Sequence, residues 1–371
     1  AEKGKAYSHK LMTDQIMKGR AKTADRDALL ARIKPTAEYA DLKNVDLIVE
    51  AVFEQQDVKK GVTEQTEAVI GKDIIFASNT STIPITQLAK NSKRPEQFIG
   101  IHFFSPVEKM LLVEIILGEK TGALALATAL DYVRAIKKTP IVVNDSRGFF
   151  ANRCVLNYIL EGHLMLDEGI PPAMIENAGK MAGMPVGPLS LNDEVALDLG
   201  WKILNATKKD LGPKAISPVQ EKILEFMVVK NERFGRKNGK GFYDYDGRNK
   251  KLWPGLAKLQ KKTLDPDKLD IGELKHRLLV TQALEAARTV EDGVIVDPRE
   301  ADVGSILGFG FAPFTGGTLS YIDGMGAKAF VALCRDLEKK HGPRFKPNKL
   351  LVEMAAKGET FYGRMALKKA A

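Results

Sequence analysis

The sequence predicts an α/β domain with a parallel or mostly parallel sheet, followed by an all-helical region. In the first 145 residues, short apolar runs alternate with helical segments, which is typical of a sheet covered by helices on both faces. After residue 149 the pattern is mainly helical with glycine and proline breaks, and it repeats once. We therefore expect three units, covering residues 1–145, 146–250 and 251–371.

The chain opens with two expected helices, of which Gly19 ends the first and Thr23 caps the second before Pro35 stops the helical pattern. Apolar runs of strand length follow at residues 46–53, 73–77, 98–104, 110–116 and 140–143. Helical segments separate them around residues 58–70, 86–90 and 122–136.

Polar side chains come directly after several of the expected strands. Glu54 follows the first apolar run, Asn79 and Ser81 follow the second, and Ser105 follows the third. Ligands of such sheets bind at the carboxyl ends of the strands. We therefore expect binding groups at these positions.

Two consecutive apolar runs, at residues 98–104 and 110–116, each contain an ionisable residue. His102 stands between Ile101 and Phe103, and Glu114 stands in the next run, between valine and isoleucine. A buried carboxylate is costly unless another group pairs with it, and a neighbouring imidazole is its natural partner. A histidine oriented by a carboxylate is the usual general base near neutral pH, so we predict that His102 and Glu114 form such a pair.

The helical region contains two related units. In both, a glycine follows an arginine after 16 residues, at Arg153 and Gly169 in the first copy and at Arg277 and Gly293 in the second. Further matching positions are Asn152 with His276, Glu161 with Glu285, and Asp193 with Asp323. Two related helical units in one chain can pack as an internal pseudo-dimer.

Composition and charge exclude some classes of protein. The net charge is +9, but the charge is spread along the chain and no nucleic-acid-binding motif is present. A phosphate-rich small molecule such as coenzyme A or a dinucleotide accounts for the charge equally well, and a solvated lysine-rich surface accounts for most of it. The two cysteines and five histidines show no metal-ligand spacing, and no apolar run is long enough to span a membrane.

Five motifs together resemble the L-3-hydroxyacyl-CoA dehydrogenases. They cover residues 79–82, 100–106, 112–114, 148–153 and 237–242. The doubled helical region resembles the dehydrogenase half of multifunctional fatty acid β-oxidation enzymes, of the bacterial fatty acid oxidation complex type. The resemblance implies a Rossmann-like NAD-binding domain followed by an all-α domain of two repeats, and NAD-dependent oxidation of L-3-hydroxyacyl-CoA to 3-ketoacyl-CoA.

The resemblance also implies roles for individual residues. His102 would take the proton of the substrate hydroxyl, Glu114 would orient His102, and Ser81 and Asn152 would hydrogen-bond substrate oxygens. The residues implied to contact NAD are Ala51, Val52, Phe53, Glu54, Lys59, Asn79, Ser81 and Ser105. The family usually has asparagine at position 105, and the serine found here has a shorter reach.

A second departure from the family concerns the start of the sheet. A dinucleotide-binding domain normally opens with a strand, a Gly-x-Gly-x-x-Gly turn, a helix and an acidic residue. This sequence has no such opening, so we expect the NAD-binding domain to lack its first βαβ unit and its first strand to be an unpaired edge. We expect this chain to bind NAD poorly and to turn over little, and the alternative function is a fragment that retains only acyl-CoA or partner binding.

The resemblance also suggests partners and a location. We expect an acyl-CoA substrate, an enoyl-CoA hydratase domain and a thiolase subunit as partners, with no nucleic acid and no membrane span. The cysteine usage favours a reducing compartment, and the bacterial resemblance favours the cytoplasm.

Each candidate residue also has a purely structural interpretation. His102 could be a core histidine with satisfied hydrogen bonds. Ser81 could cap the helix that follows it, and Asn152 could cap the helix after residue 150. Lys59 could be a solvated residue on a helix surface.

Overall fold

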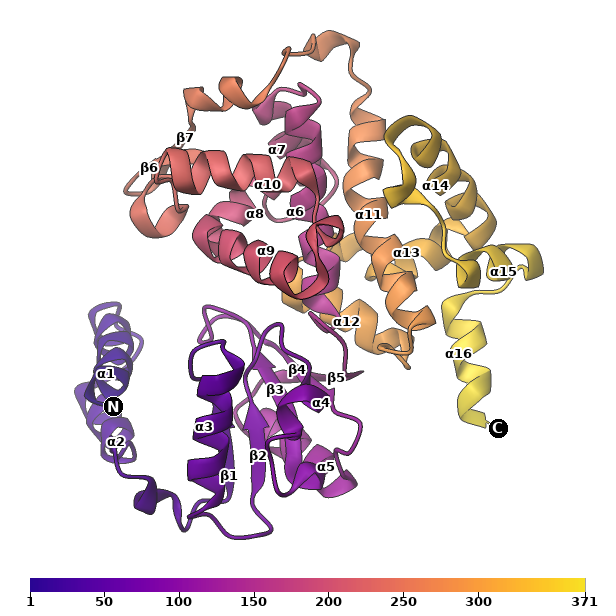
Figure 1. Cartoon of the computed structure of the whole chain (residues 1–371). Coiled ribbons are helices and arrows are strands. Elements are labelled where there is room, and N and C mark those ends of the chain that lie inside the picture. The colour runs from indigo at the N-terminus through magenta and orange to yellow at the C-terminus, as the bar shows by residue number, and fades with distance from the viewer. Residues whose placement is uncertain (371) are drawn as a thin grey trace.

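The computed structural model describes residues 1–370, with side chains through residue 365. A sheet domain and a larger helical region are joined where the last strand of the sheet leads into the first long helix of that region (Figure 1). This arrangement confirms the predicted fold class. The exact boundaries of the three units stay a prediction.

The main sheet has the strand order β1-β2-β3-β4-β5. Its strands are β1 (Leu47–Glu50), β2 (Ile75–Ser78), β3 (Phe98–Phe103), β4 (Leu112–Leu117) and β5 (Thr139–Asn144). Strands β3 and β4 are antiparallel, whereas every other neighbouring pair is parallel. The sheet is therefore mostly parallel, as the alternation of apolar runs and helices predicted.

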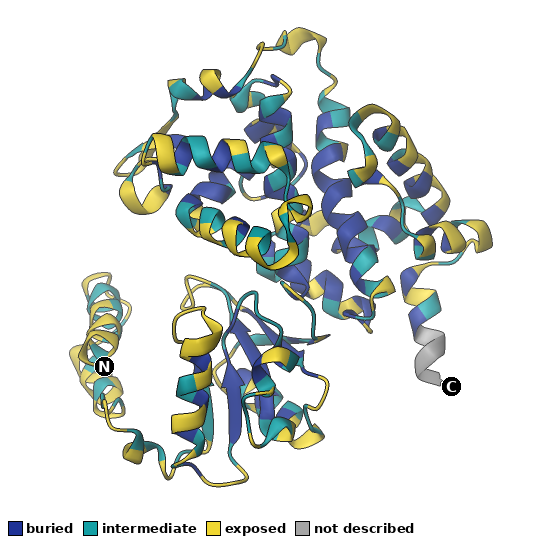
Figure 2. Ribbon diagram, viewed as in Figure 1, coloured by how far each residue is buried: buried dark blue, intermediate teal, exposed yellow. Residues whose placement is uncertain are grey.

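Helices cover both faces of this sheet. On one face α5 (Ala123–Ala135) packs its small side chains against the inward-facing isoleucines of β3 and β4. On the other face lie α4 (Ile85–Ala89) and α3 (Gln56–Glu67), together with part of the helical region. Figure 2 shows the central strands as almost wholly buried, which explains why these runs are apolar at nearly every position.

Two helices precede the sheet and lie apart from it, beyond α3 in Figure 1. They are α1 (Glu2–Met17) and α2 (Thr23–Ala31), and neither contains a buried residue. The N-cap of α2 is Lys22, so the prediction that Thr23 occupies this position is wrong by one residue. In the part of the chain that the structure describes, β1 is an edge strand with β2 as its neighbour.

The first helical copy contains α6 (Ala151–Asp167), α7 (Pro172–Met181), α8 (Pro188–Val195), α9 (Leu197–Leu211) and α10 (Pro218–Leu224). It ends in a hairpin of β6 (Tyr243–Asp246) and β7 (Asn249–Leu252). The second copy contains α11 (Ile271–Glu291), α12 (Pro298–Phe309), α13 (Thr318–Met325), α14 (Ala327–His341), α15 (Lys349–Lys357) and α16 (Phe361–Ala370).

The two copies use the same polar contacts to fix their helices. Glu176 in α7 accepts hydrogen bonds from the first turn of α8 and from the hydroxyl of Tyr243, at 2.8 Å. Asp302 in α12 accepts hydrogen bonds from the first turn of α13 and from the hydroxyl of Tyr362, at 2.9 Å. The internal repeat therefore extends to the aromatic residues near the end of each copy.

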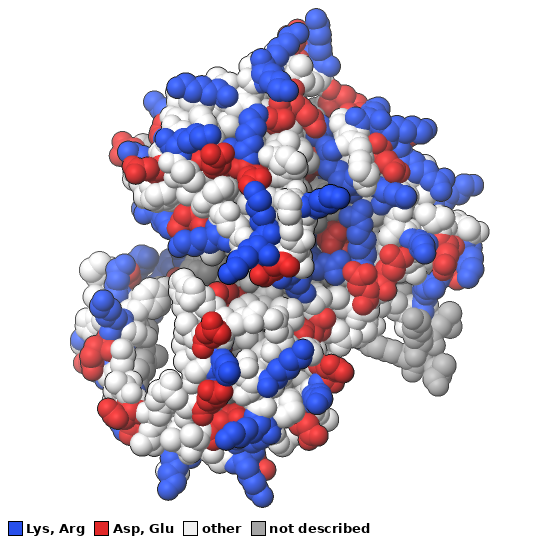
Figure 3. All heavy atoms as spheres, viewed as in Figure 1, with Lys and Arg blue, Asp and Glu red and all other residues white. Residues whose placement is uncertain are grey.

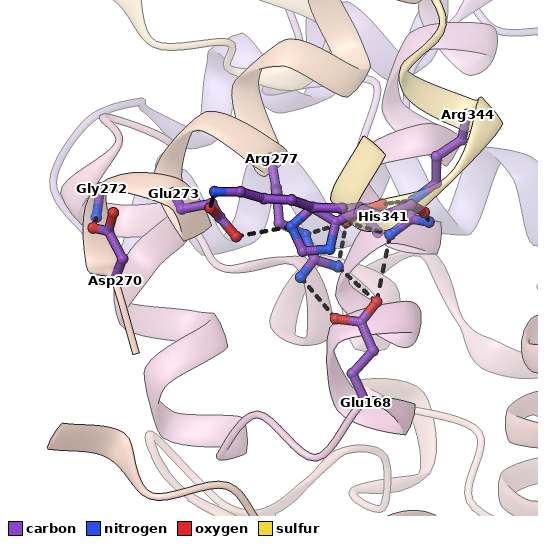
Figure 4. A network of polar contacts seen from close by, with 9 residues as sticks. Glu168, Asp270, Gly272, Glu273, Arg277, His341 and Arg344 are labelled. Carbon is purple, nitrogen blue, oxygen red and sulfur yellow. Dashed lines mark hydrogen bonds and ion pairs between the residues drawn. The ribbon is translucent and has the colours of Figure 1, made fainter. Parts of the chain in front are cut away.

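The copies are joined by reciprocal ion pairs between α6 and α11. Arg153 of the first copy donates to Glu285 of the second at 2.8 Å, and Arg277 of the second donates to Glu161 of the first at 2.7 Å. Figure 4 shows Arg277 also directed at Glu168. Such an exchange of equivalent contacts is the pattern of a twofold interface, here formed within one chain.

Buried His163 in α6 should make stability depend on pH. Its Nε2 lies 2.8 Å from Asn192 Oδ1, its Nδ1 has no partner, and burial lowers its pKa from 6.5 to about 4. Between pH 6.5 and 4 the ring of His163 binds a proton in the unfolded protein but stays neutral in the folded one. Its contribution to the free energy of unfolding is therefore complete above pH 6.5 and is lost as the pH falls toward 4. We expect the free energy of unfolding of the wild type, relative to a His163→Gln variant, to fall by about 2 kcal/mol between pH 7.5 and 5.

Urea titration at both pH values gives the free energy of unfolding of the wild type and of His163→Gln. The difference between the two proteins isolates the contribution of His163. Asp193 has the opposite behaviour, because burial raises the pKa of its carboxyl to about 6. Asp193 is present in both proteins, so its contribution cancels in the difference. A difference that stays the same at both pH values would contradict the prediction.

Charged side chains are distributed over the molecule. Figure 3 shows lysine and arginine on the sheet domain and on the helical region, mixed with aspartate and glutamate over the visible face. Among the described residues, no group of three histidine, cysteine, aspartate or glutamate side chains is arranged to hold a metal ion. Within the same residues, no helix has both the length and the apolar character needed to cross a bilayer.

Candidate active site

The centre of the candidate site is a histidine–glutamate pair on two adjacent strands. His102 in β3 and Glu114 in β4 are directly opposite in the antiparallel register, and His102 Nδ1 lies 2.8 Å from Glu114 Oε2. The exposed fraction is 4% for His102 and 0% for Glu114. The structure therefore brings together the two residues that the sequence singled out.

The second oxygen of Glu114 is also engaged. Glu114 Oε1 accepts hydrogen bonds from the backbone N–H groups of Phe150 at 3.2 Å and Ala151 at 2.8 Å. These groups open α6, and the start of a helix favours a negative charge. The carboxylate of Glu114 is thus held between the start of α6 and the imidazole of His102.

This arrangement determines which ring nitrogen of His102 can act as a base. A carboxylate oxygen accepts but does not donate, so Nδ1 carries the proton and Nε2 is the basic nitrogen. The rings of Phe104 and Phe149 lie 4.7 and 5.9 Å from the imidazole, measured between centroids. Their presence keeps the surroundings of the pair apolar, which strengthens its electrostatic interaction.

A hydrogen bond between a side chain and the main chain joins Asn152 to Ser81 near this pair. Asn152 Nδ2 donates to the carbonyl oxygen of Ser81 at 3.0 Å, which connects the loop after β2 to the start of α6. Neither residue caps a helix. The first N–H groups of α6 are bound by Glu114, and those of α4 are bound by Asp145, so the capping interpretations of Ser81 and Asn152 are wrong.

Glu54 holds the loop that contains Ser81. Its Oε1 accepts from Thr80 Oγ1 at 2.7 Å, from the N–H of Ser81 at 2.9 Å and from the N–H of Thr82 at 3.0 Å. Partial burial alone would raise the pKa of Glu54, but the hydrogen bond from Thr80 and the charge of Lys59 bring it below its usual value. Glu54 is therefore an anion that fixes the loop.

Lys59 is buried, with an exposed fraction of 1%, so the interpretation of Lys59 as a solvated surface residue is wrong. Its Nζ lies 2.8 Å from Glu50 Oε1 and 3.4 Å from Glu54 Oε2. Glu50 also accepts a hydrogen bond from Ser78 Oγ at 2.7 Å. Lys59 thus connects the end of β1 with the loop that carries Ser81.

Sequence reasoning missed Glu50. It lies in the apolar run of β1, and we treated it there as part of a strand. The available signal was the same as for Glu114, namely a carboxylate among aliphatic residues with a basic residue nearby in the sequence. Glu50 is 4% exposed, and Lys59 is the partner that makes its burial possible.

The remaining predicted residues lie around these groups. Asn79 Oδ1 accepts a hydrogen bond from the N–H of Phe103 at 2.8 Å, which ties the ends of β2 and β3 together beside His102. Ser105 is exposed in the turn after β3. Three further residues, Ala51, Val52 and Phe53, follow β1 and are exposed. Their cofactor roles stay predictions.

Comparisons with protein families match the sheet domain and the first helical copy. Residues 1–146 match the family model described as 3-hydroxyacyl-CoA dehydrogenase, NAD binding domain, and residues 148–245 match its C-terminal domain. Curated relatives named fatty acid oxidation complex subunit alpha, from Shewanella amazonensis and Shewanella loihica, are 42% and 41% identical over 360 residues, covering 96% of this chain and 50% of each relative. The chain thus spans about half the length of the curated relatives it matches.

Solved structures give a consistent result. The 3-hydroxybutyryl-CoA dehydrogenase of Escherichia coli has a TM-score of 0.81 at 22% identity, covering 96% of this chain and 91% of that chain, which shows the fold. The (S)-3-hydroxybutyryl-CoA dehydrogenase of Ralstonia eutropha is 35% identical with a TM-score of 0.60, covering 66% of this chain and 86% of that chain.

Proposed function

This chain belongs to the 3-hydroxyacyl-CoA dehydrogenase family, and we propose that it oxidises L-3-hydroxyacyl-CoA to 3-ketoacyl-CoA with NAD in fatty acid β-oxidation. The observation that supports this proposal is the buried His102–Glu114 pair at the carboxyl end of β3. An alcohol oxidation needs a base for the hydroxyl proton, and Nε2 of His102 is the nitrogen left for that task.

The proposed mechanism assigns one proton transfer to the protein. His102 Nε2 takes the proton from the 3-hydroxyl while the C3–H bond breaks and the carbonyl forms. NAD, when bound, supplies the acceptor for the hydride that leaves carbon 3. Glu114 keeps Nδ1 protonated and stabilises the imidazolium that His102 becomes.

Ser81 and Asn152 are proposed to orient the substrate oxygens. The hydroxyl of Ser81 and the amide of Asn152 come from the two sides of the junction between the sheet domain and α6. Groups that approach the substrate from both sides hold it in a reactive geometry, which lowers the entropic part of the barrier. They would also favour the developing carbonyl.

The described residues fit one end of NAD better than the other. Glu54, Lys59, Asn79 and Ser81 form a connected polar edge beside His102, which suits the nicotinamide and its ribose. We therefore propose that the nicotinamide end of NAD contacts these residues.

The reverse reaction tests the proposal directly. We expect acetoacetyl-CoA to be reduced as the near-ultraviolet absorbance of NADH falls. A fluorescence titration with NADH measures the cofactor affinity independently of turnover. Tight NADH binding without any reduction of acetoacetyl-CoA would contradict the proposed chemistry.

The alternative to catalysis is binding alone, and the same measurements test it. In that case the chain would bind acyl-CoA, or a partner subunit, without turnover. Retention on an immobilised acyl-CoA together with undetectable NADH binding would favour it over the dehydrogenase.

The names of the relatives point to an assembly. Relatives of this chain are alpha subunits of a fatty acid oxidation complex. We propose that the chain acts beside an enoyl-CoA hydratase domain and a thiolase subunit in the bacterial cytoplasm, with acyl-CoA as its small-molecule partner. Co-purification of tagged chain with a thiolase would support this proposal.

A further inference from the structure

The second helical copy covers the free edge of the sheet at β5. The N–H of Val142 donates to Glu300 Oε2 at 3.2 Å, and the N–H of Asn144 donates to the carbonyl oxygen of Val294 at 2.9 Å. Pro140, two residues before Val142, has no N–H to donate. The outward-facing donors of this edge are therefore satisfied by residues about 150 positions later in the chain.

Helix α12 approaches the sheet closely because of two glycines one turn apart. A Cβ atom on Gly304 would lie 2.7 Å from Ile141 Cδ1 and 3.0 Å from Phe150 Cε1. A Cβ atom on Gly308 would lie 2.6 Å from Leu112 Cδ2. These distances are shorter than ordinary carbon contacts, so any larger residue would force α12 or its neighbours to move.

The neighbours of these glycines lead directly to the catalytic pair. The ring of Phe150 also faces that of Phe309 at the end of α12, 6.3 Å away between centroids. Phe150 and Ala151 are the residues whose N–H groups bind Glu114, and Glu114 in turn binds His102. Leu112 and Glu114 belong to the same strand, two residues apart. A shift of α12 would therefore reach Glu114 through both the strand and the helix start.

We propose that Gly304 and Gly308 are positioning residues for the dehydrogenase reaction. They allow α12 to hold β4, β5 and the start of α6 together, and this keeps the carboxylate of Glu114 on the imidazole of His102. The second helical copy thus acts on the reaction without supplying a group that touches the substrate. The effect on turnover rests on the proposed role of His102 as the base, whereas the effect on the geometry of the pair does not.

Gly308→Ala tests this inference. We expect the amides of Phe150 and Ala151 to exchange with deuterium roughly tenfold faster, because their hydrogen bonds to Glu114 weaken. Nitrogen NMR reports which ring nitrogen of His102 carries the proton, and the absence of the signal in His102→Gln assigns it. In Gly308→Ala we expect that the form with a protonated Nδ1 and an unprotonated Nε2 is no longer dominant. Acetoacetyl-CoA reduction should slow in kcat, with the KM for acetoacetyl-CoA unchanged.

Gly324→Ala is the matched control. Gly324 lies in α13 of the same copy, and a Cβ atom there would have no heavy atom within 4 Å. We expect this variant to match the wild type in all three measurements. Combining Gly308→Ala with Leu112→Val, which removes the contacted Cδ2 atom, should restore the wild-type exchange rate and ring signals.

The possible outcomes separate the two proposals. Changed ring signals in Gly308→Ala with unchanged turnover would support the positioning role and refute His102 as the base. A lower melting temperature with wild-type ring signals and wild-type exchange at residues 150–151 would show that the glycine is merely structural, and would overturn the inference.

If Gly308→Ala does not fold, Glu300→Ala removes the hydrogen bond to Val142 instead, and unchanged signals there would overturn the inference as well.

Discussion

Replacing His102 with glutamine should lower kcat for acetoacetyl-CoA reduction by about a thousandfold and leave the protein folded. The glutamine amide can donate to Glu114 in place of Nδ1, so the buried carboxylate keeps a partner. It cannot exchange a proton with the substrate oxygen, because an amide is not a base near neutral pH. Steady-state rates at saturating NADH, with circular dichroism as the measure of folding, check this result.

His276→Gln is the matched control for this substitution. His276 is exposed in α11, and it occupies the position in the second copy that Asn152 occupies in the first. We expect the rate and the melting temperature of this variant to equal those of the wild type. Near-normal turnover in His102→Gln would mean that another group accepts the proton, and the mechanism proposed here would have to be abandoned.

Replacing Arg277 with methionine should destabilise the protein by about 3 kcal/mol. Arg277 is 1% exposed, and it donates to Glu161, which is also 1% exposed, as well as to Glu168. Removing the guanidinium leaves a buried carboxylate without its main partner, which is costly. Arg344 also contacts Glu161 at 2.6 Å, so the loss is expected at the lower end of the usual range for a broken buried pair.

The internal repeat provides the control for this prediction. Arg153→Met removes the equivalent arginine of the first copy, but its side chain is 19% exposed, and its partners Glu285 and Asp292 are 12% and 51% exposed. Solvent screens these charges, so we expect a loss of about 1 kcal/mol. Urea unfolding followed by helical circular dichroism compares the two variants. Equal losses of unfolding free energy in Arg277→Met and Arg153→Met would contradict the view that burial of the ion pair determines the cost of breaking it.

Much of this molecule could be predicted from local sequence patterns. Apolar runs of strand length, separated by helical segments, predicted the mostly parallel sheet, and the repeated arginine-to-glycine spacing predicted two related helical copies. His102 and Glu114 stood out because ionisable residues are rare within such runs. Lys59 was harder to interpret, because a lysine in a helix is usually solvated and its burial depends on Glu50 in another element.

The sequence by itself determined the fold class and the identity of the histidine–glutamate pair, because both follow from periodicity and composition over short distances. Only the tertiary structure decided that β3 and β4 run antiparallel, which places His102 directly opposite Glu114. It also decided that α12 packs against β4 and β5 through Gly304 and Gly308. These contacts join segments far apart in the chain, and their geometry depends on strand register and helix packing, which no local pattern of residues specifies.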